Sequence, residues 1–525
     1  MKKTKIFLYI LLGLLVIGLV PIVFLNTWAM CRLWQVGREK TPEGLNRWEE
    51  TVRIAKTVPA GKNLLEIPLW QTFMDEHLSE GSNMFFSGVS HSSGMSTNAL
   101  SVWESKLDAR KDFYWNTSPI GAPKGEKSYA MELPTLERIR AEVAKMNKKR
   151  SRSKEMTEKV LLLQGLLERY DVEGSELSEE QKVASFFLEY VDLENDPVWG
   201  EVQKSLKECS YFGIPWEKYI KEYGRGDENF LYFITLPHLS TLRTLAEDAV
   251  LKAQCYSVLG DREKCLSELE RALDLVYLKQ QSPMLLNFLI RMRDERVIFN
   301  IIHEIIARNI LTEEDLTGIQ TRLAQINPTE DLLYCLEGEQ VWGEKMIGHP
   351  ASLSEDGKVP WTLSFLWRAS GLIPFNKATY IQMFWKLQDA LNPESQTMDY
   401  ATWKSAGEGS ESIFNFMCKP LAPATDRILY KFLRYQSEKD ATVLACALER
   451  YRLKEGSFPE KLEMLIPKYL PQMPPGSLEQ GSLSYNRTEK GYELILNKLP
   501  GVTDIPPSFP PEESGVEVVW KRSRE

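Results

Sequence analysis

The sequence predicts a mainly α-helical protein with an N-terminal transmembrane helix, a helical bundle or short solenoid, and a small C-terminal α+β module with an antiparallel sheet. Three patterns predict it: an uncharged apolar run at the N-terminus, apolar residues at helical spacing from Leu133 onward, and alternating apolar residues near the C-terminus. Along the 525 residues we expect a signal anchor at 1–30, a mixed loop-rich region at 31–130, a helical domain at 131–395, a linker at 396–425 and the α+β module at 426–525.

The composition is that of a folded protein whose default partner is not nucleic acid. Hydrophobic residues make up 43% of the chain and charged residues 26%, which argues against a collagen, a coiled coil or wholesale disorder. The 64 Lys and Arg against 73 Asp and Glu give a net charge of −9. A general affinity for nucleic acid backbones is therefore not expected.

The membrane is the first expected partner, through the run from Ile6 to Leu25. This run carries no charge, and about 20 apolar residues suffice to span a hydrocarbon core of about 30 Å. The residues that follow, Asn26 to Met30, contain no A-x-A cleavage pattern, which favours an uncleaved signal anchor over a removed signal peptide.

The orientation of this anchor does not follow from charge alone. Three basic residues precede the run (Lys2, Lys3 and Lys5) and three follow it closely (Arg32, Arg38 and Lys40). The short basic head is typical of a signal-anchor n-region, which favours the N-terminus inside. We expect a single-pass protein of the bacterial inner (cytoplasmic) membrane with the bulk of the chain extracytoplasmic.

The clearest helical pattern lies at 238–326. Leu242, Leu245, Ala249 and other apolar residues step by three or four, Gly260-Asp261 turns the chain, and a return helix follows, so 241–278 is predicted to be an antiparallel helical hairpin. A third helix is expected from about Pro283 and a fourth from Thr312. Earlier in the chain, Ser178 to Gln181 has the sequence of a capping box that starts a helix.

Within this hairpin, Ala253, Tyr256, Gly260, Leu269 and Ala272 resemble the small, aromatic, glycine and alanine positions of a tetratricopeptide hairpin. The resemblance implies an interaction scaffold with no catalytic group of its own. An unrelated helical hairpin with small residues where its helices approach is the alternative, because no second copy with the same period is visible.

The C-terminal module is predicted to be a helix followed by a sheet. Gly456 should end the helix in a left-handed turn, Phe458 should fill the core and Pro459 prevents continuation. Leu483 and Tyr485, then Tyr492, Leu494 and Leu496, alternate as in a β-hairpin, and Val516, Val518 and Trp520 suggest a third strand.

The stretch Ala447-Leu448-Glu449-Arg450-Tyr451-Arg452-Leu453, followed by Gly456-Ser457-Phe458-Pro459, resembles the helix-to-sheet junction of type II secretion pseudopilins. The same end of the chain, with Pro374-Phe375-Asn376-Lys377 before a helix, is similar to an uncharacterised family of singly anchored bacterial envelope proteins. The first resemblance implies a component of a secretion system, and the second implies no known activity.

Groups able to do chemistry are sparse. The seven cysteines form no C-x-x-C pair; Cys255 and Cys265 flank the Gly260 turn and are either bridged or buried as separate thiols. His303-Glu304 begins like a zincin motif, but Ala307 stands where the second histidine ligand belongs, so His303 is expected to be a polar-face or satisfied helix residue.

One nucleophile can be named. Ser90-His91-Ser92-Ser93-Gly94 approaches a nucleophile elbow, so a hydrolase using Ser92 is an alternative, with a flexible polar loop as the other reading.

The basic run from Lys145 to Lys154 is expected to be a solvated helix face. We predict no catalytic, cofactor-binding or metal-ligating residue. The function expected is extracytoplasmic binding or scaffolding of protein partners, with a pseudopilin-related secretion component and the Ser92 hydrolase as alternatives.

Overall fold

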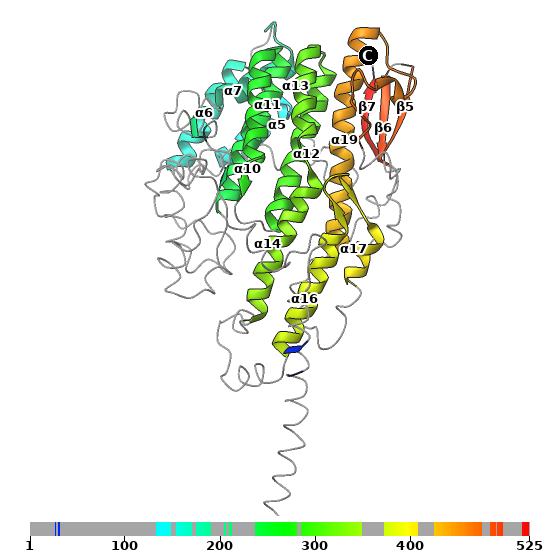
Figure 1. Cartoon of the computed structure of the whole chain (residues 1–525). Coiled ribbons are helices and arrows are strands. Elements are labelled where there is room, and N and C mark those ends of the chain that lie inside the picture. Colours follow the sequence, from blue (N-terminus) through cyan, green and yellow to red (C-terminus); the bar gives the residue numbers. More distant parts are fainter. Residues whose placement is uncertain are drawn as a thin grey trace, which may run out of the picture.

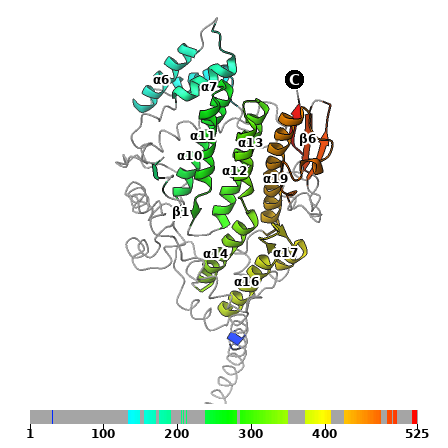
Figure 2. The ribbon, with the colours of Figure 1, turned by 45° about the horizontal axis from the view of Figure 1, so that its top comes forward.

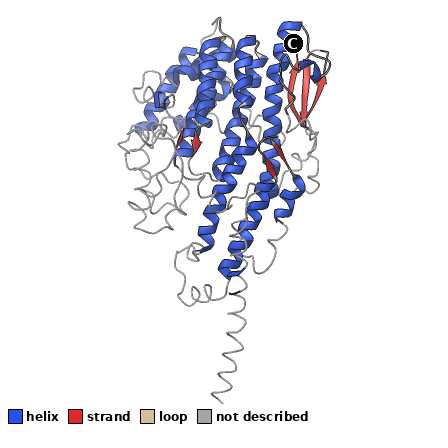
Figure 3. Ribbon diagram, in the orientation of Figure 1, coloured by secondary structure: helices blue, strands red, loops and turns tan. Residues whose placement is uncertain are grey.

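The computed structural model describes ten stretches of the chain and a few scattered residues. The stretches are 133–148, 154–170, 175–190, 237–280, 285–348, 372–407, 425–474, 483–489, 491–496 and 517–523; the scattered residues are 27, 30, 31, 204, 205, 208, 211 and 212. Helices dominate this part of the chain, and a small sheet lies at one end (Figure 3). The expected mainly helical fold is confirmed.

The helices fall into three groups along the chain (Figure 1). The first is α5 (Leu136–Lys148), α6 (Lys154–Tyr170) and α7 (Glu179–Tyr190). The second is α10 (Pro237–Leu259), α11 (Arg262–Val276), α12 (Leu285–Ala307) and α13 (Glu313–Ala324). The third is α14 (Pro328–Gly348), α16 (Leu372–Asp389), α17 (Tyr400–Gly407) and the long α19 (Thr425–Glu455), with a 3₁₀ turn at Leu462–Leu465.

The strands are short and form separate sheets. β1 (Tyr211–Phe212) pairs in parallel with β2 (Lys279–Gln280), and β3 (Leu391–Asn392) pairs antiparallel with β4 (Thr397–Met398). Near the C-terminus, β5 (Leu483–Arg487), β6 (Gly491–Leu496) and β7 (Glu517–Ser523) form an antiparallel sheet in the order β5-β6-β7. The predicted hairpin and third strand are confirmed.

Two helical hairpins of the same design lie side by side. In each, a long helix is followed by a tight turn and a shorter return helix: α10 with α11, then α12 with α13. α10 packs against both α11 and α12, and α12 packs on against α19, which also contacts α13 (Figure 2). α19 therefore takes the place of the long helix of a third hairpin, although about 100 residues separate it from α13. We call α10 to α13 with α19 the hairpin stack.

The two hairpin turns use equivalent devices. A left-handed residue lies in each turn, Gly260 with φ 75° and Asn309 with φ 56°, and glycine and asparagine are the residues that adopt this conformation at least cost. A side-chain cap then opens each return helix: Asp261 accepts from the Lys264 N–H, and Thr312 forms a reciprocal capping box with Asp315. The predicted turn at Gly260 and the helix start at Thr312 are confirmed.

Helices α5, α6 and α7 form a satellite core on the outer side of α10. Phe186 and Phe187 of α7 are fully buried there, and Leu251 and Cys255 of α10 belong to the same cluster. The predicted capping box at the start of α7 is present, since the Ser178 hydroxyl accepts from the Gln181 N–H while the Gln181 side chain accepts from the Ser178 N–H. The opposite side of α10 faces the main core, so this helix is buried between two clusters.

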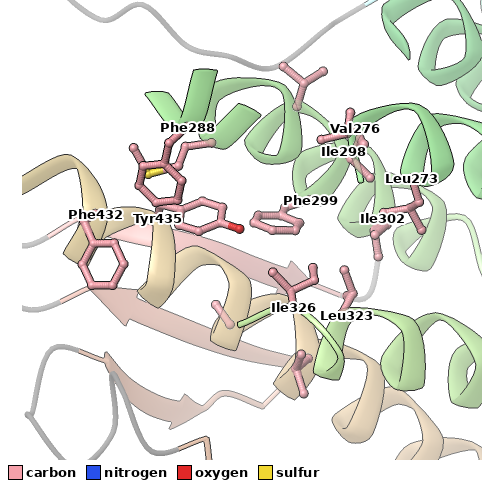
Figure 4. Packing of buried hydrophobic residues seen from close by; sticks show 14 of the residues in the cluster. Leu273, Val276, Phe288, Ile298, Phe299, Ile302, Leu323, Ile326, Phe432 and Tyr435 are labelled. Carbon is pink, nitrogen blue, oxygen red and sulfur yellow. The ribbon is translucent and has the colours of Figure 1, made fainter. Parts of the chain in front are cut away.

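The main core runs from the first hairpin to the C-terminal sheet. At its centre Tyr435 of α19 stacks beside Phe299 of α12, with ring centroids 5.8 Å apart, and Phe288 faces Phe432 at 6.4 Å (Figure 4). Leu483, Tyr492 and Leu494 of the sheet belong to the same cluster as Leu245 of α10. The helices and the sheet therefore share one apolar core.

α14 and α16 approach unusually closely at Gly343. A β-carbon at that position would lie 2.0 Å from the hydroxyl oxygen of Tyr380, so only glycine leaves room for the tyrosine ring. The Tyr380 hydroxyl donates to the backbone carbonyl of Glu339, one turn earlier on α14. α16 begins at Leu372, so the motif starting at Pro374 lies inside its first turns and not before the helix as the resemblance implied.

The junction between α19 and the sheet has the predicted geometry. Gly456 follows the helix with φ 79°, and its N–H donates to the Arg452 carbonyl. Phe458 is buried edge-on against Tyr492 of β6, with ring centroids 4.9 Å apart. Part of the expected linker is structured, since β4 and α17 lie within 396–425.

No helix in the described stretches is both long and apolar enough to cross a membrane. The predicted anchor, Ile6 to Leu25, lies outside the described residues. The anchor therefore stays a prediction.

Candidate functional site

The main core contains a layer of charged side chains around α12, which the packing of apolar residues does not explain. They come from α10, α12, α14 and α19, and most are largely buried. We call these side chains, together with the hydroxyl of Tyr435 that contacts them, the charged core: Arg243, Glu247, Arg291, Asp294, Glu295, Arg296, Asp331, Tyr435, Glu438 and Lys439.

Glu295 is the most deeply buried acid of this group, with no exposed surface. Its Oε1 lies 3.3 Å from Nε of Arg291, and the Nη2 of Arg291 lies 2.5 Å from Oδ2 of Asp331 on α14. The hydroxyl of Tyr435 on α19 donates a hydrogen bond to Oε2 of Glu295. Burial raises the pKa of Glu295 to about 7, with the charge of Arg291 acting in the opposite direction.

The tyrosines near Glu295 keep their protons. Burial, and then the charge of Glu295, hold the pKa of Tyr435 well above its ordinary value, so the hydroxyl remains a donor. The same two causes raise the pKa of Tyr277, whose buried hydroxyl lies at the C-terminal end of α11. For Arg291, burial acts to lower the pKa, but the negative charges of Asp331 and Glu295 outweigh it and hold the pKa above its usual value. The guanidinium therefore stays charged.

Asp294 faces the other way, towards α10. Its Oδ1 lies 3.7 Å from Nε of Arg243, which is also 2.7 Å from Oε1 of Glu247. Burial raises the pKa of Asp294 to about 7, and the charge of Glu247 adds to the effect. A cavity of about 30 Å³ lies beside it, lined by Arg243, Asn287, Arg291 and apolar residues of α10, α11 and α12; this volume is too small for a metabolite.

Glu438 of α19 is held by two arginines. Arg296 of α12 donates from both Nε and Nη2 to its two oxygens, and Arg434 donates from Nε at 3.0 Å. Burial acts to raise the pKa of Glu438, but Arg296 and Arg434 outweigh it and hold the pKa below its ordinary value. This forked pair joins α12 to α19 across 142 residues of sequence.

A buried lysine completes the layer near the β3-β4 hairpin. Lys439 donates to the Ile326 carbonyl at 3.2 Å and to Oε1 of Gln396 at 3.0 Å, and lies 3.5 Å from Asp440. Gln396 has φ 53°, so its backbone adopts the left-handed conformation at the tip of that hairpin. Lys439 therefore fixes the hairpin and the end of α13 to α19.

His303 lies in helix α12, as the sequence predicted, and is hydrogen-bonded through one of its two ring nitrogens. It is 2% exposed, and its Nε2 lies 3.1 Å from the Thr442 hydroxyl of α19. Burial lowers the pKa of His303 to about 3, so the imidazole is neutral at ordinary pH. A neutral ring without solvent access is not arranged to exchange protons with a substrate.

Cys255 and Cys265 are separate thiols in the structure. Cys255 packs in the satellite core and Cys265 in the main core, so they lie on different faces of the first hairpin. Burial raises the pKa of both, that of Cys265 to about 12, and burial does the same for Cys335 and Cys446. These four are thiols and not thiolates at neutral pH.

The other residues singled out from the sequence are placed only in part. Ser92 lies outside the described residues. Of the basic run, Lys145 and Lys148 end α5, where Lys145 is exposed and pairs with Glu142 at 3.4 Å, as a solvated helix face predicts. Among the described residues no cluster of three His, Cys, Asp or Glu side chains could hold a metal ion.

Sequence reasoning missed the charged core. The run Arg291 to Arg296 reads as a solvated helix segment, because it mixes three bases with two acids. The available signal was that most of the remaining positions of α12 are apolar, including the consecutive pairs Ile298-Phe299 and Ile301-Ile302, which is typical of a helix buried on more than one side.

Comparison of the chain with protein-family models, curated proteins and solved structures found no match.

Proposed function

We propose that this chain is a membrane-anchored scaffold that holds protein partners on its hairpin stack. The observation that carries the proposal is the repeated hairpin: α10 with α11 and α12 with α13 share one design, and α19 continues the row. Rows of stacked hairpins present long surfaces on a rigid frame, and proteins use such surfaces for binding.

The chemistry of the core supports binding over catalysis. The charged groups of the core pair with one another across helices, as in Arg296 with Glu438, and so serve to fix helix positions. The buried thiols and His303 are held in their uncharged forms. These groups stabilise a frame and are not aimed into a cavity that could hold a substrate.

Other elements of the fold pack against both ends of the hairpin stack. Phe186 and Phe187 of α7 pack the satellite core against α10, and the C-terminal sheet packs on α19 at the other side. A stack of hairpins needs such caps, because an end helix would otherwise expose its apolar face. The arrangement supports a scaffold of fixed length, bounded by the satellite core on one side and the C-terminal sheet on the other.

The anchor part of the proposal rests on the sequence from Ile6 to Leu25. We propose one membrane span with the N-terminus inside and the hairpin stack extracytoplasmic, in a bacterial inner membrane. A protease added to spheroplasts should then degrade a tag fused after Glu525 while a cytoplasmic marker stays intact. Protection of the tag until the membrane is lysed would refute this orientation.

Crosslinking in native membranes tests the scaffold. The tagged full-length protein is crosslinked and purified, and attached proteins are identified by mass spectrometry. A reproducible partner in near-stoichiometric amount, lost when Phe186→Asp and Phe187→Asp disrupt the satellite core, supports the proposal. Recovery of the protein alone from crosslinked membranes contradicts it.

A second candidate is a component of a pseudopilin-related secretion system. It is favoured by the junction after α19, where Gly456 in a left-handed turn, Phe458 against Tyr492 and an antiparallel sheet follow the helix in order. Pilin-like proteins among the crosslinked partners would support it. Partners of another class, with no pilin-like protein, would exclude it in favour of the general scaffold.

A further inference from the structure

A small cavity lies where α10, α11 and α12 meet, beside Asp294. Its volume is about 30 Å³, and its lining combines apolar residues of the three helices with the side chains of Arg243, Asn287, Arg291 and Asp294. The last three are spaced by four and three residues along α12, so they share one face of that helix. The cavity therefore lies in the contact between the first hairpin and the second.

The carboxyl group of Asp294 has a buried oxygen at this contact. The side chain is 9% exposed, and its Oδ1 accepts no hydrogen bond from the residues that the structure describes. Nε of Arg243 lies 3.7 Å from this oxygen, which exceeds the hydrogen-bond range, and the Nε hydrogen is donated to Glu247 at 2.7 Å. Buried polar atoms in proteins nearly always have a partner, so Oδ1 of Asp294 requires another donor.

The charges of the lining disfavour an ion in this cavity. A cation would meet the guanidinium groups of Arg243 and Arg291, and an anion would meet the carboxylate of Asp294. A neutral molecule that both donates and accepts hydrogen bonds can contact the two signs of charge at once, because guanidinium groups donate and carboxylates accept. The lining therefore fits a small neutral molecule with a hydroxyl group.

Size restricts this molecule to water. A cavity of roughly 10–15 Å³ already holds one water molecule, whose share of liquid volume is about 30 Å³. The cavity beside Asp294, at about 30 Å³, is large enough for one water and too small for a larger molecule. Polar groups more than about 3.5 Å apart, such as Oδ1 of Asp294 and Nε of Arg243, are also at the spacing where a bridging water is expected.

We propose that this cavity binds one ordered water molecule, which donates a hydrogen bond to Oδ1 of Asp294 and accepts one from the guanidinium group of Arg243. The water joins α12 of the second hairpin to α10 of the first. The contact between the two hairpins is thus bridged, whereas α12 and α19 are joined directly by Arg296 and Glu438. The site does not depend on the proposed scaffold function.

A crystal structure of the full-length protein in detergent, at a resolution that shows ordered water, tests the site. Crystals at pH 8 keep the Asp294 carboxyl ionised, because its pKa is about 7. The expected result is a density peak about 3 Å from both Oδ1 of Asp294 and a guanidinium nitrogen of Arg243. An empty cavity, or a direct hydrogen bond from Arg243 to Asp294 in its place, would overturn the proposal.

Soaks in bromide and in rubidium separate water from ions of either sign. Water gives no anomalous peak in either soak, so the expected result is none at this position. An anomalous peak from bromide would make the cavity an anion site, and one from rubidium would make it a cation site. Either peak would overturn the assignment to water.

A larger side chain in the lining should displace the water. Val276→Ile adds one methyl group to an apolar residue of the cavity wall, so the density peak should be lost. Val443→Ile adds the same group to a buried valine of α19 that does not line the cavity, and should keep the peak. A peak that persists in Val276→Ile would contradict the proposed position. If that variant fails to fold, the wild-type crystals and their two soaks decide the question.

Discussion

The hydroxyl of Tyr435 on α19 donates a hydrogen bond to the buried carboxyl of Glu295 on α12. The two residues are 140 positions apart in the sequence. Their helices are not consecutive in the chain but pack directly against each other. The bond gives a buried carboxyl oxygen a hydrogen-bond partner. The ring that carries the hydroxyl packs beside Phe299 in the apolar core (Figure 4). It ties the second hairpin to the long helix that continues the row.

Tyr435→Phe should lower the free energy of unfolding by about 1–3 kcal/mol, because Oε2 of Glu295 loses its donor while the ring is kept. Urea unfolding of the purified protein measures the change. Tyr451→Phe, on the same helix and outside the charged core, is the control and should change stability by less than about 0.5 kcal/mol. Equal losses of unfolding free energy in the two variants would show that the hydrogen bond to Glu295 does not contribute to stability.

Gly343→Ala should destabilise the contact between α14 and α16 by about 1–3 kcal/mol, because the new methyl group would overlap the Tyr380 ring. In a Tyr380→Ala background the same substitution should cost far less. Gly318→Ala on α13 is the matched control: nothing lies near its β-carbon position, so helix propensity should make it neutral or stabilising by up to about 1 kcal/mol. Additive costs for Gly343→Ala and Tyr380→Ala would contradict the overlap.

Gly456→Ala should cost about 1–2 kcal/mol, because alanine is strained at φ 79°. The free space around this residue excludes a steric clash as the cause. Gly456→Asn should cost less than Gly456→Ala, since asparagine adopts the left-handed conformation more readily. Chemical unfolding of both variants makes the comparison, and an asparagine variant no more stable than the alanine variant would argue against backbone strain.

His303 should make the protein less stable in mild acid. Its pKa is lowered by burial to about 3, so between pH 6.5 and pH 3 the unfolded chain binds a proton that the folded chain does not. Stability is therefore lost as the pH falls below 6.5, by up to about 1.4 kcal/mol for each pH unit. Asp294 and Glu295 act with the opposite sign, so the test is the difference between wild type and His303→Gln.

That difference should be constant above pH 7 and shrink as the pH falls from 6.5 towards 4. The variant keeps a polar group that can reach the Thr442 hydroxyl but does not titrate. A difference that stays constant over the whole range would mean that His303 titrates alike in folded and unfolded chains.

The buried cysteines should be unreactive in the native protein. Alkylation of the folded, unreduced protein, followed by peptide mass mapping, should label exposed Cys31 and leave Cys255, Cys265, Cys335 and Cys446 unlabelled. Denaturant without reductant should expose all four. Labelling of Cys255 and Cys265 only after reduction would mean that they are bridged in the native protein, which would contradict their assignment as separate thiols.

The local parts of this fold follow from the sequence, because they depend on neighbouring residues. The Gly260 turn, the Thr312 and Ser178 caps, the left-handed Gly456 and the β-hairpin that contains Leu483 and Leu496 were all predicted from residue type and spacing. Each of these features is decided within a few positions of the chain.

The long-range parts do not follow from it. Asn309 takes in the second hairpin the role that Gly260 has in the first, so the structural repeat leaves no matching sequence signature. The charges of Arg291 to Arg296 resemble a solvated surface, and only the arrival of α14 and α19 from distant parts of the chain buries them. Residue spacing carries no information on which distant helix will cover a given face.

A double-mutant cycle on Arg296 and Glu438 tests most directly the central claim that the charged core joins α19 to α12 of the second hairpin. Arg296→Met, Glu438→Gln and the double variant are unfolded in urea, with Arg322→Met and Asp274→Asn as the control cycle for an exposed pair between α13 and α11. We predict a coupling energy of about 1–3 kcal/mol for Arg296 with Glu438 and less than about 1 kcal/mol for the control. A coupling energy near zero for Arg296 with Glu438 would contradict the claim.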